Sequence, residues 1–187
     1  MFFFTDGNKI VFSRVSIEVV DRHDDFRDAI VQHIDAAHNL ARWLMRDAAD
    51  AEDVVQESYA RALKYRDGFA GGDMRSWLLR IVRNTCYTFL RHRHGWTEFD
   101  ELDHGGVLDD AEDISIARLD AAKLATILME LPTEYREVLI LREIEDLSYR
   151  EISQIADTPV GTVMSRIARA RKRLRSAAME QIGASQR

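Results

Sequence analysis

The sequence predicts an all-α protein of two small helical domains joined by an acidic flexible linker. Only two of its 187 residues are proline and nine are glycine, which favours long uninterrupted helices. From Phe26 onward, apolar residues recur at steps of three and four, the spacing of an amphipathic helix. Strands that alternate with helices are not visible after the first twenty residues, which argues against a parallel sheet with a nucleotide site.

Composition excludes several classes of protein. The single cysteine, Cys86, cannot form an internal disulfide or a cysteine-paired zinc site, and we expect it to pack rather than to act as a nucleophile. The six histidines lack metal-protease spacing, and no apolar run is long enough to span a membrane. We therefore expect a cytoplasmic protein that is not an enzyme, without metal, cofactor or membrane insertion.

Residues 1–22 are an unassigned N-terminal extension. Their alternating apolar residues between Val11 and Val19 are weakly strand-like, and a short edge strand, a disordered tail or an upstream-extended start codon all remain open. The first domain is expected to span residues 23–95 and to begin with one amphipathic helix. The stripe of that helix that we expect to be buried comprises Phe26, Ile30, Ile34, Ala37, Ala41 and Leu44.

A second helix is predicted to open at Asp50, with this residue as N-cap and further carboxylates in the first turn, where the helix dipole favours negative charge. Helical spacing then leaves an acidic face opposite the apolar one. That face comprises Asp53, Gln56 and Glu57. It suits a docking surface for a basic partner and a solvated helix face about equally well. Acid–base catalysis by these carboxylates would need an apolar pocket that the sequence does not indicate.

A glycine-containing loop at residues 66–73 precedes a long helix predicted from about Met74 to His92. The loop lacks the GK[ST] of a phosphate-binding loop, but its glycines permit close backbone approach to a ligand. The helix carries arginines beside an aromatic ring and an amide, which suits a nucleic-acid strand with unstacked bases better than a closed duplex. Trp77 borders both faces and is expected in the core, with a stacking surface as the alternative. The candidate contacts are Phe69, Arg80, Arg83, Asn84, Tyr87 and Arg91.

Residues 96–116 are predicted to form the acidic linker. Glu98 to Asp113 carries eight acids, neither Lys nor Arg, and no sustained periodicity. Its charge could keep the segment extended, or it could shield basic helices or enter a basic channel of a partner. The second domain is expected to span residues 117–187, and it begins with two amphipathic helices on either side of Pro132.

The stretch from Leu147 to Arg175 is typical of a helix-turn-helix. Ser148 and Glu151 have the spacing of a capping box, so a helix is predicted to start at Ser148. Thr158 as N-cap and Pro159 as first helical residue would open the next helix. Although the net charge of the chain is −6, this second helix is strongly basic, as expected of a helix against phosphates rather than a merely solvated one. Its candidate DNA contacts are Thr162, Ser165, Arg166, Arg169 and Arg173.

Three stretches carry a resemblance to a known family. They are DAEDVVQESYARAL from Asp50, RSWLLRIVRN from Arg75, and a segment from Leu131 that contains LPTEYREV, LSYREI and VGTVMSRIARAR in that order. With them, residues 26–94 and 119–175 resemble the extracytoplasmic-function sigma factors of bacterial RNA polymerase. The resemblance implies an N-terminal bundle of sigma region 2 type and a C-terminal helix-turn-helix of sigma region 4 type.

The resemblance also implies partners and residue roles. Core RNA polymerase would be bound through its beta-prime clamp coiled coil and its beta flap, promoter DNA would be recognised and melted, and an anti-sigma factor would hold the protein inactive. The residues docking on the clamp would be Asp50, Asp53, Gln56 and Glu57. The residues capturing the minus-10 element, with a flipped base against the loop, would be Phe69, Arg80, Arg83, Asn84, Tyr87 and Arg91. The residues reading the minus-35 element would be Thr162, Ser165, Arg166, Arg169 and Arg173.

Two positions depart from the family pattern. Met164 stands where members often carry Lys or Arg, so promoter preference is expected to differ. Asp157 stands where glycine is common in the turn, but aspartate tolerates a left-handed backbone. The alternatives to a sigma factor are a helix-turn-helix regulator, or a sigma-mimic adaptor, that acts without polymerase.

Overall fold

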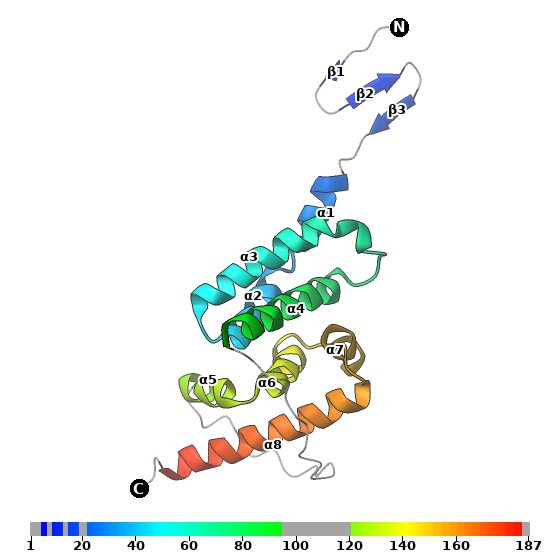
Figure 1. The fold of residues 1–187 in the computed structure, drawn as a ribbon. Helices are drawn as coiled ribbons and strands as arrows, with labels where there is room; N and C mark the ends of the chain where they lie inside the picture. Colours follow the sequence, from blue (N-terminus) through cyan, green and yellow to red (C-terminus); the bar gives the residue numbers. More distant parts are fainter. Residues whose placement is uncertain (1–4, 7–8, 13–14, 19–21, 95–120, 185–187) are drawn as a thin grey trace.

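The computed structural model describes residues 5–6, 9–12, 15–18, 22–94 and 121–184. Its helices form an N-terminal unit (residues 22–94) and a C-terminal unit (residues 121–184) that pack against each other (Figure 1). The N-terminal unit comprises α1 (Arg22–Val31), α2 (Ile34–Met45), α3 (Ala48–Lys64), the short 3₁₀-helix η1 (Arg66–Gly68) and α4 (Met74–His94). The C-terminal unit comprises α5 (Ala121–Glu130), α6 (Thr133–Leu139), the π-helical turn η3 (Ile140–Ile144), α7 (Tyr149–Ala156) and α8 (Val160–Ala184). The predicted all-α class is confirmed for both units, and the predicted acidic linker lies outside the described residues.

Three short strands precede the helices. They are β1 (Thr5–Asp6), β2 (Lys9–Phe12) and β3 (Val15–Glu18), and they form an antiparallel sheet in the order β1-β2-β3. The alternating pattern of the sequence left a strand open as one possibility, and the strands bear that out.

The first predicted helix is in fact two helices. A turn at Gln32 and His33 separates α1 from α2, and the His33 amide donates to the Ile30 carbonyl at 2.9 Å. The single-helix prediction was wrong because neither glycine nor proline marks the break, and the apolar steps of three and four continue across it. The stripe itself is correct. Its buried members are Ile30, Ala37, Ala41 and Leu44, and Phe26 and Ile34 are half-buried against the same core.

Helix α3 begins three residues earlier than predicted. Its N-cap is Asp47, whose carboxylate accepts hydrogen bonds from the amides of Ala49 at 2.9 Å and Asp50 at 3.0 Å. The prediction of Asp50 as N-cap was wrong because both aspartates suit the position, and the choice depends on where α2 ends. Asp50 instead lies in the first turn of the helix, where the dipole still favours its charge.

The helix-turn-helix is built as its capping pattern predicts. Ser148 accepts from the amide of Glu151 at 3.3 Å, while the Glu151 carboxylate accepts from the Ser148 amide at 2.7 Å. These hydrogen bonds from Ser148 lower the pKa of Glu151. Helix α7 ends at Ala156, and its C-cap Asp157 has a φ of 51°, the left-handed conformation that aspartate was expected to tolerate.

The start of α8 differs by one residue from the prediction. Its first helical residue is Val160, and the carbonyl of Pro159 accepts from the Val163 amide at 3.0 Å. The hydroxyl of Thr158 donates backward to the Ala156 carbonyl at 3.2 Å. Thr158 therefore does not act as the N-cap of α8. Its hydroxyl instead satisfies a carbonyl at the end of α7, where the last carbonyls have no partner within the helix.

We expect Ser148→Ala to lower the free energy of unfolding by about 1 kcal/mol, since the capping box loses its hydroxyl acceptor. Urea denaturation followed by circular dichroism measures the change. Ser176→Ala, at an exposed position within α8, is the matched control and should change stability by less than about 0.5 kcal/mol. Equal stability of the two variants would contradict the capping role.

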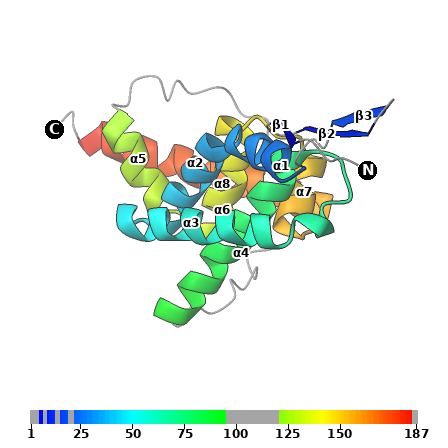
Figure 2. The same ribbon diagram turned by 90° about the horizontal axis from the view of Figure 1, so that it is seen from above.

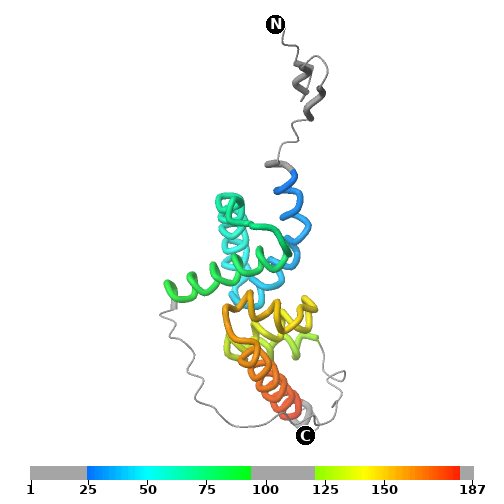
Figure 3. Tube along the Cα trace, turned by 90° about the vertical axis from the view of Figure 1, so that its right-hand side faces the viewer, coloured from blue at the N-terminus to red at the C-terminus, as the bar shows by residue number. Residues whose placement is uncertain are grey.

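The two units share one continuous core. Helix α4 packs on α7, and α2 packs on α6 and η3 (Figures 1 and 3). Buried side chains of the C-terminal unit, among them Val138, Leu141 and Ile152, belong to the same apolar cluster as Leu40 and Leu79 of the N-terminal unit. A flexible acidic linker, as predicted, does not indicate whether the two units that it joins pack together. The sequence alone therefore did not predict the interface between the N-terminal and C-terminal units.

Candidate nucleic-acid and protein interfaces

The acidic face predicted on α3 is largely open to solvent. Asp53, Gln56 and Glu57 are exposed, and Glu57 makes an ion pair with Arg61 one turn on, at 2.7 Å. Asp50 differs from the other three, because its carboxylate pairs with Arg93 of α4 and its side chain is only 16% exposed. Three of the four predicted docking residues therefore share an accessible surface, and the fourth ties α3 to α4.

Phe69 belongs to an aromatic cluster at the start of α4. Its ring centroid lies 6.1 Å from that of Phe26 and 5.4 Å from that of Trp77, and the Phe26 and Trp77 centroids are 5.9 Å apart. Trp77 is half-buried and packs against the hydrophobic core, in keeping with the core position expected for it. Phe26 was assigned only to the core stripe, since nothing local in the sequence brings it to a ring in a distant loop.

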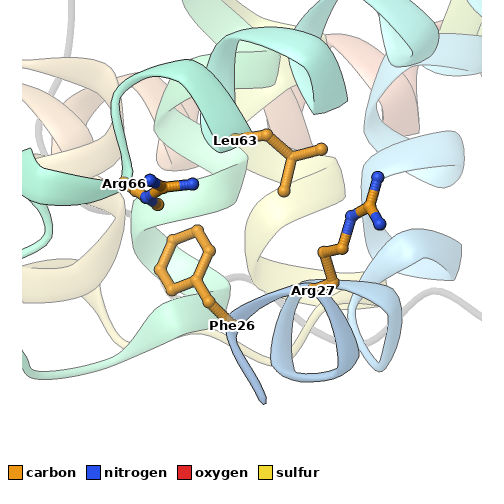
Figure 4. A pocket seen from close by; sticks show the side chains of 4 residues that line it. All are labelled: Phe26, Arg27, Leu63 and Arg66. Carbon is orange, nitrogen blue, oxygen red and sulfur yellow. The ribbon is translucent and has the colours of Figure 1, made fainter. Parts of the chain in front are cut away.

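An open hollow adjoins this aromatic cluster. Figure 4 shows its four lining side chains, which combine two apolar groups with two guanidinium groups. These residues are Phe26, Arg27, Leu63 and Arg66. Two cations around an aromatic and aliphatic surface can accept both a phosphate and an unstacked base. The sequence had not singled out either arginine.

The loop before α4 has a defined backbone. Gly71 and Gly72 adopt φ values of 91° and 101°, which residues with side chains rarely adopt. Asp73 then caps α4, since its carboxylate accepts from the amides of Ser76 at 2.8 Å and Arg75 at 3.3 Å. Partial burial tends to raise the pKa of Asp73, but its hydrogen bonds outweigh burial and lower that pKa. This cap fixes how the loop that carries Phe69 enters α4.

The basic face of α4 divides into two parts. Arg80, Asn84 and Arg91 are exposed, as predicted from helical spacing. The C-terminal turns of α4 project from the body of the molecule, which leaves this part of the helix accessible (Figures 2 and 3). These three side chains are therefore positioned to meet a large partner directly.

The other part of the basic face, formed by Arg83 and Tyr87, lies against the C-terminal unit. The Arg83 Nε donates to Glu137 at 2.8 Å, and the Tyr87 hydroxyl donates to the same carboxylate at 2.7 Å. Tyr87 is 6% exposed, so the expectation that it lies on a free face is wrong in this arrangement. Helical spacing had placed it correctly beside Arg83, but α6 covers that face. Burial, followed by the charge of Glu137, raises the pKa of Tyr87.

Helix α8 packs through Val163, Ile167 and Ala170, which are buried. Of the predicted contacts, Arg173 is exposed, with its guanidinium 5.0 Å from the ring centroid of Tyr135. The other four are half-buried along the helix; they are Thr162, Ser165, Arg166 and Arg169. They occupy the helix that a helix-turn-helix places in the major groove.

The first turns of α8 present an apolar edge. Val160 is 40% exposed and Met164 is 41% exposed, and a side chain at Gly161 would point into open space, with no atom within 4 Å beyond the adjacent residues and the backbone of the helix itself. The N-terminal residues of a recognition helix are the ones that contact base edges. Met164, which the sequence analysis singled out, is therefore exposed in the part of the helix that contacts base edges.

Other kinds of site find no support in the part of the chain that the structure describes. No group of three or more His, Cys, Asp or Glu residues could hold a metal ion there. None of the described helices combines the length and apolarity of a membrane span. Cys86 is fully buried, and burial followed by the nearby charge of Glu137 raises the pKa of its thiol to about 12, which fits its expected packing role.

Comparison with known proteins places both units in described families. Residues 29–96 match Sigma-70 region 2, and residues 121–174 match Sigma-70, region 4. The ECF RNA polymerase sigma factor SigW of Bacillus subtilis is 30% identical over 166 residues, which cover 81% of this chain and 88% of that protein. SigE of Mycolicibacterium smegmatis, also an ECF RNA polymerase sigma factor, is 33% identical over 153 residues, which cover 79% of this chain and 59% of that protein.

A solved structure also resembles the chain across both units. It is the sigma factor RpoE in complex with the anti-sigma factor NepR from Bartonella quintana, with a TM-score of 0.66 and 29% sequence identity. The similarity covers 82% of this chain and 96% of that one.

Proposed function

Because the chain belongs to the extracytoplasmic-function (ECF) sigma factors of bacterial RNA polymerase, we propose that its two helical units divide promoter recognition between them. A domain of residues 23–95 binds core polymerase and opens the minus-10 element, and a domain of residues 117–187 reads the minus-35 element. One observation supports this division: α4 and α8 both bear a face with arginines, and they belong to different units. The unit that contains α4 also has the acidic face of α3.

The acidic face of α3 is the proposed docking surface for polymerase. Asp53, Gln56 and Glu57 would meet basic side chains of the beta-prime clamp coiled coil, and the second domain would contact the beta flap. Charges at the edge of such an interface mainly steer association and fix its register. Asp50 would join the contact only after its carboxylate exchanges Arg93 for a polymerase cation.

The aromatic cluster and α4 are the proposed site for the minus-10 strand. The ring of Phe69 lies 6.1 Å from that of Phe26, which lines the hollow of Figure 4. A flipped base could stack there, and each stacked base contributes about 1–3 kcal/mol. Arg80, Asn84 and Arg91 would hold the strand along the exposed part of the helix. Arg83 and Tyr87 would complete the site once Glu137 is displaced.

Helix α8 is the proposed reader of the minus-35 duplex. The residues assigned to phosphates and base edges are Thr162, Ser165, Arg166, Arg169 and Arg173. An arginine that is bidentate to guanine contributes about 1–3 kcal/mol of discrimination between bases.

The proposed partners follow from this assignment. The chain would act in the cytoplasm on core polymerase and promoter DNA, and it would itself carry out no chemical step. The related RpoE structure is a complex with an anti-sigma factor, and we propose that an anti-sigma factor also restrains this chain.

Run-off transcription separates these proposals from a regulator or adaptor that acts without polymerase. We expect the purified chain, added to core polymerase, to yield promoter-specific transcripts from a pool of genomic templates, whereas core alone yields none. A regulator would bind duplex DNA without binding core, and a sigma mimic would bind neither DNA element. Absence of any specific transcript, together with absence of core binding, would refute the proposed function.

A further inference from the structure

The first turns of α8 carry no side chain that can hydrogen-bond a base edge at two points. Residues 160–165 have the sequence VGTVMS, and the first cation of the helix is Arg166. The side chains that bind base edges at two points are those of Arg, Lys, Asn and Gln, and carboxylates accept from cytosine. The N-terminal residues of a recognition helix are the ones that contact base edges. This helix therefore meets the bases with apolar and hydroxyl groups.

The hydroxyl of Ser165 is already engaged within the helix. It donates its proton to the carbonyl of Thr162 at 2.9 Å. A hydroxyl has one proton to donate, so Ser165 keeps only its capacity to accept. Guanine presents two acceptors in the major groove, O6 and N7, and these need a donor. In this arrangement Ser165 does not select guanine.

Val160 and Met164 form an exposed apolar edge on the same turns. Both side chains are exposed, and residues four positions apart lie on one side of a helix. Gly161 lies next to this edge, and a side chain there would point into open space. Without a side chain at 161, the helix can approach a base edge closely. The apolar edge then faces whatever the bases present at that point.

The rest of α8 supplies the charge that binds phosphates. Between Arg166 and Arg175 the sequence has six Lys or Arg residues and no acid. Contacts to phosphates fix the position of a protein on duplex DNA, and contacts to base edges give it specificity. An apolar edge that is followed by such a cationic run suits the major groove of DNA better than an apolar groove of a protein. The apolar edge is therefore the part of α8 that is available for specificity.

Thymine presents an apolar group, its C5-methyl, in the major groove. We propose that Met164, with Val160 beside it, contacts a thymine methyl group of the minus-35 element and so selects an A·T pair. A cation at position 164 would favour guanine instead. The flexible, polarizable thioether of methionine fits irregular surfaces such as the floor of a groove. The inference rests on the proposed function, because it takes α8 as the helix that reads the minus-35 duplex.

The test removes the methyl group from the DNA and the thioether from the protein. Core polymerase carrying the full-length chain transcribes an equal mixture of two templates whose run-off products differ in length. One template has a promoter found by run-off transcription, and the other has deoxyuridine, which lacks only the methyl group, in place of one minus-35 thymine. Each thymine of either strand is replaced in turn. The ratio of the two products measures the preference whatever the total activity.

We expect at least one thymine at which the unsubstituted chain favours the thymine template about fourfold. Fourfold corresponds to about 0.8 kcal/mol, the value for burying one methyl group, since about 1.4 kcal/mol is a factor of ten. Met164→Ala should bring the ratio at that thymine to about one. Met164→Leu should keep the preference, because leucine offers a similar apolar volume.

The matched control is Met179→Ala. Met179 is also an exposed methionine of α8, but it lies about 22 Å further along the helix axis. The control should keep the fourfold preference for thymine. Because a thymine methyl also affects the stiffness of DNA, the decisive observation is that the preference depends on Met164 and not on Met179.

Three results would overturn the role of Met164. One is a minus-35 element without any thymine whose methyl group matters. Another is a preference that Met164→Ala leaves unchanged, which would assign the methyl group to another side chain or to DNA shape. The third is equal loss of the preference in Met164→Ala and Met179→Ala. If the unsubstituted chain yields no promoter-specific transcript at all, the proposed function fails, whereas transcripts without a methyl preference refute this inference alone.

Discussion

Charge reversal at Asp53 and Glu57 is expected to weaken binding of core polymerase about a hundredfold, while the affinity of the C-terminal unit for duplex DNA stays unchanged. Each substitution would set an arginine against basic side chains of the partner, and opposed like charges cost several kcal/mol, where about 1.4 kcal/mol is a factor of ten. Both carboxylates are exposed, and the pair that Glu57 makes with Arg61 is a surface contact of little weight. The fold should therefore tolerate D53R/E57R.

Titration of fluorescently labelled chain with core polymerase measures this effect. The matched control is D25R/D28R, which reverses two exposed acids on α1 of the same unit and leaves the α3 face intact. Comparable weakening by both variants would refute a specific docking face. Loss of polymerase binding together with loss of duplex-DNA binding would instead indicate misfolding.

The second large effect is expected at Arg136, one of the largest fully buried side chains in the part of the chain that the structure describes. Its guanidinium donates to the carbonyls of Met129 at 2.8 Å and Leu131 at 3.0 Å, at the end of α5, and to the carbonyl of Leu44 in α2 at 3.5 Å. Burial lowers the pKa of Arg136 to about 10, so the group is still charged at neutral pH. It closes the C-terminal end of α5 and also touches the other unit.

Arg136→Ala should therefore lower the free energy of unfolding by about 3–5 kcal/mol. Each buried carbonyl left without its donor costs about 1–3 kcal/mol, and the lost volume leaves a cavity. Guanidinium denaturation followed by circular dichroism measures the loss. Arg150→Ala, which removes an exposed arginine of α7, should change stability by less than about 0.5 kcal/mol. A loss no larger than that of the control would contradict the structural role.

Local signals in the sequence predicted most of the helical elements. The Ser148 and Glu151 capping box and the left-handed Asp157 depend on residues within a few positions of one another, so they could be recognised directly. The break at His33 and the choice of Asp47 over Asp50 as N-cap depend instead on how α1, α2 and α3 meet. Those boundaries are set by packing, which periodicity does not report.

The candidate sites show the same limit. Helical spacing correctly put Arg83 and Tyr87 on one face of α4, but it could not reveal that Glu137 covers them, because that contact spans at least 50 residues of sequence. In the same way, Phe26 joins Phe69 only through the fold. A pattern indicates which side chains are grouped, and the tertiary structure decides which of them face solvent.

The burial of Cys86 bears on how oxidants could influence transcription through this protein. It is the one cysteine in the chain, it is fully buried, and its thiol pKa is raised to about 12. Oxidants and disulfides react with the thiolate, which is almost absent at neutral pH when the pKa is that high. In this arrangement the chain has no accessible reactive thiol of its own. A redox signal that acts on thiols would have to be sensed by another molecule and reach the promoter through its contacts with this chain.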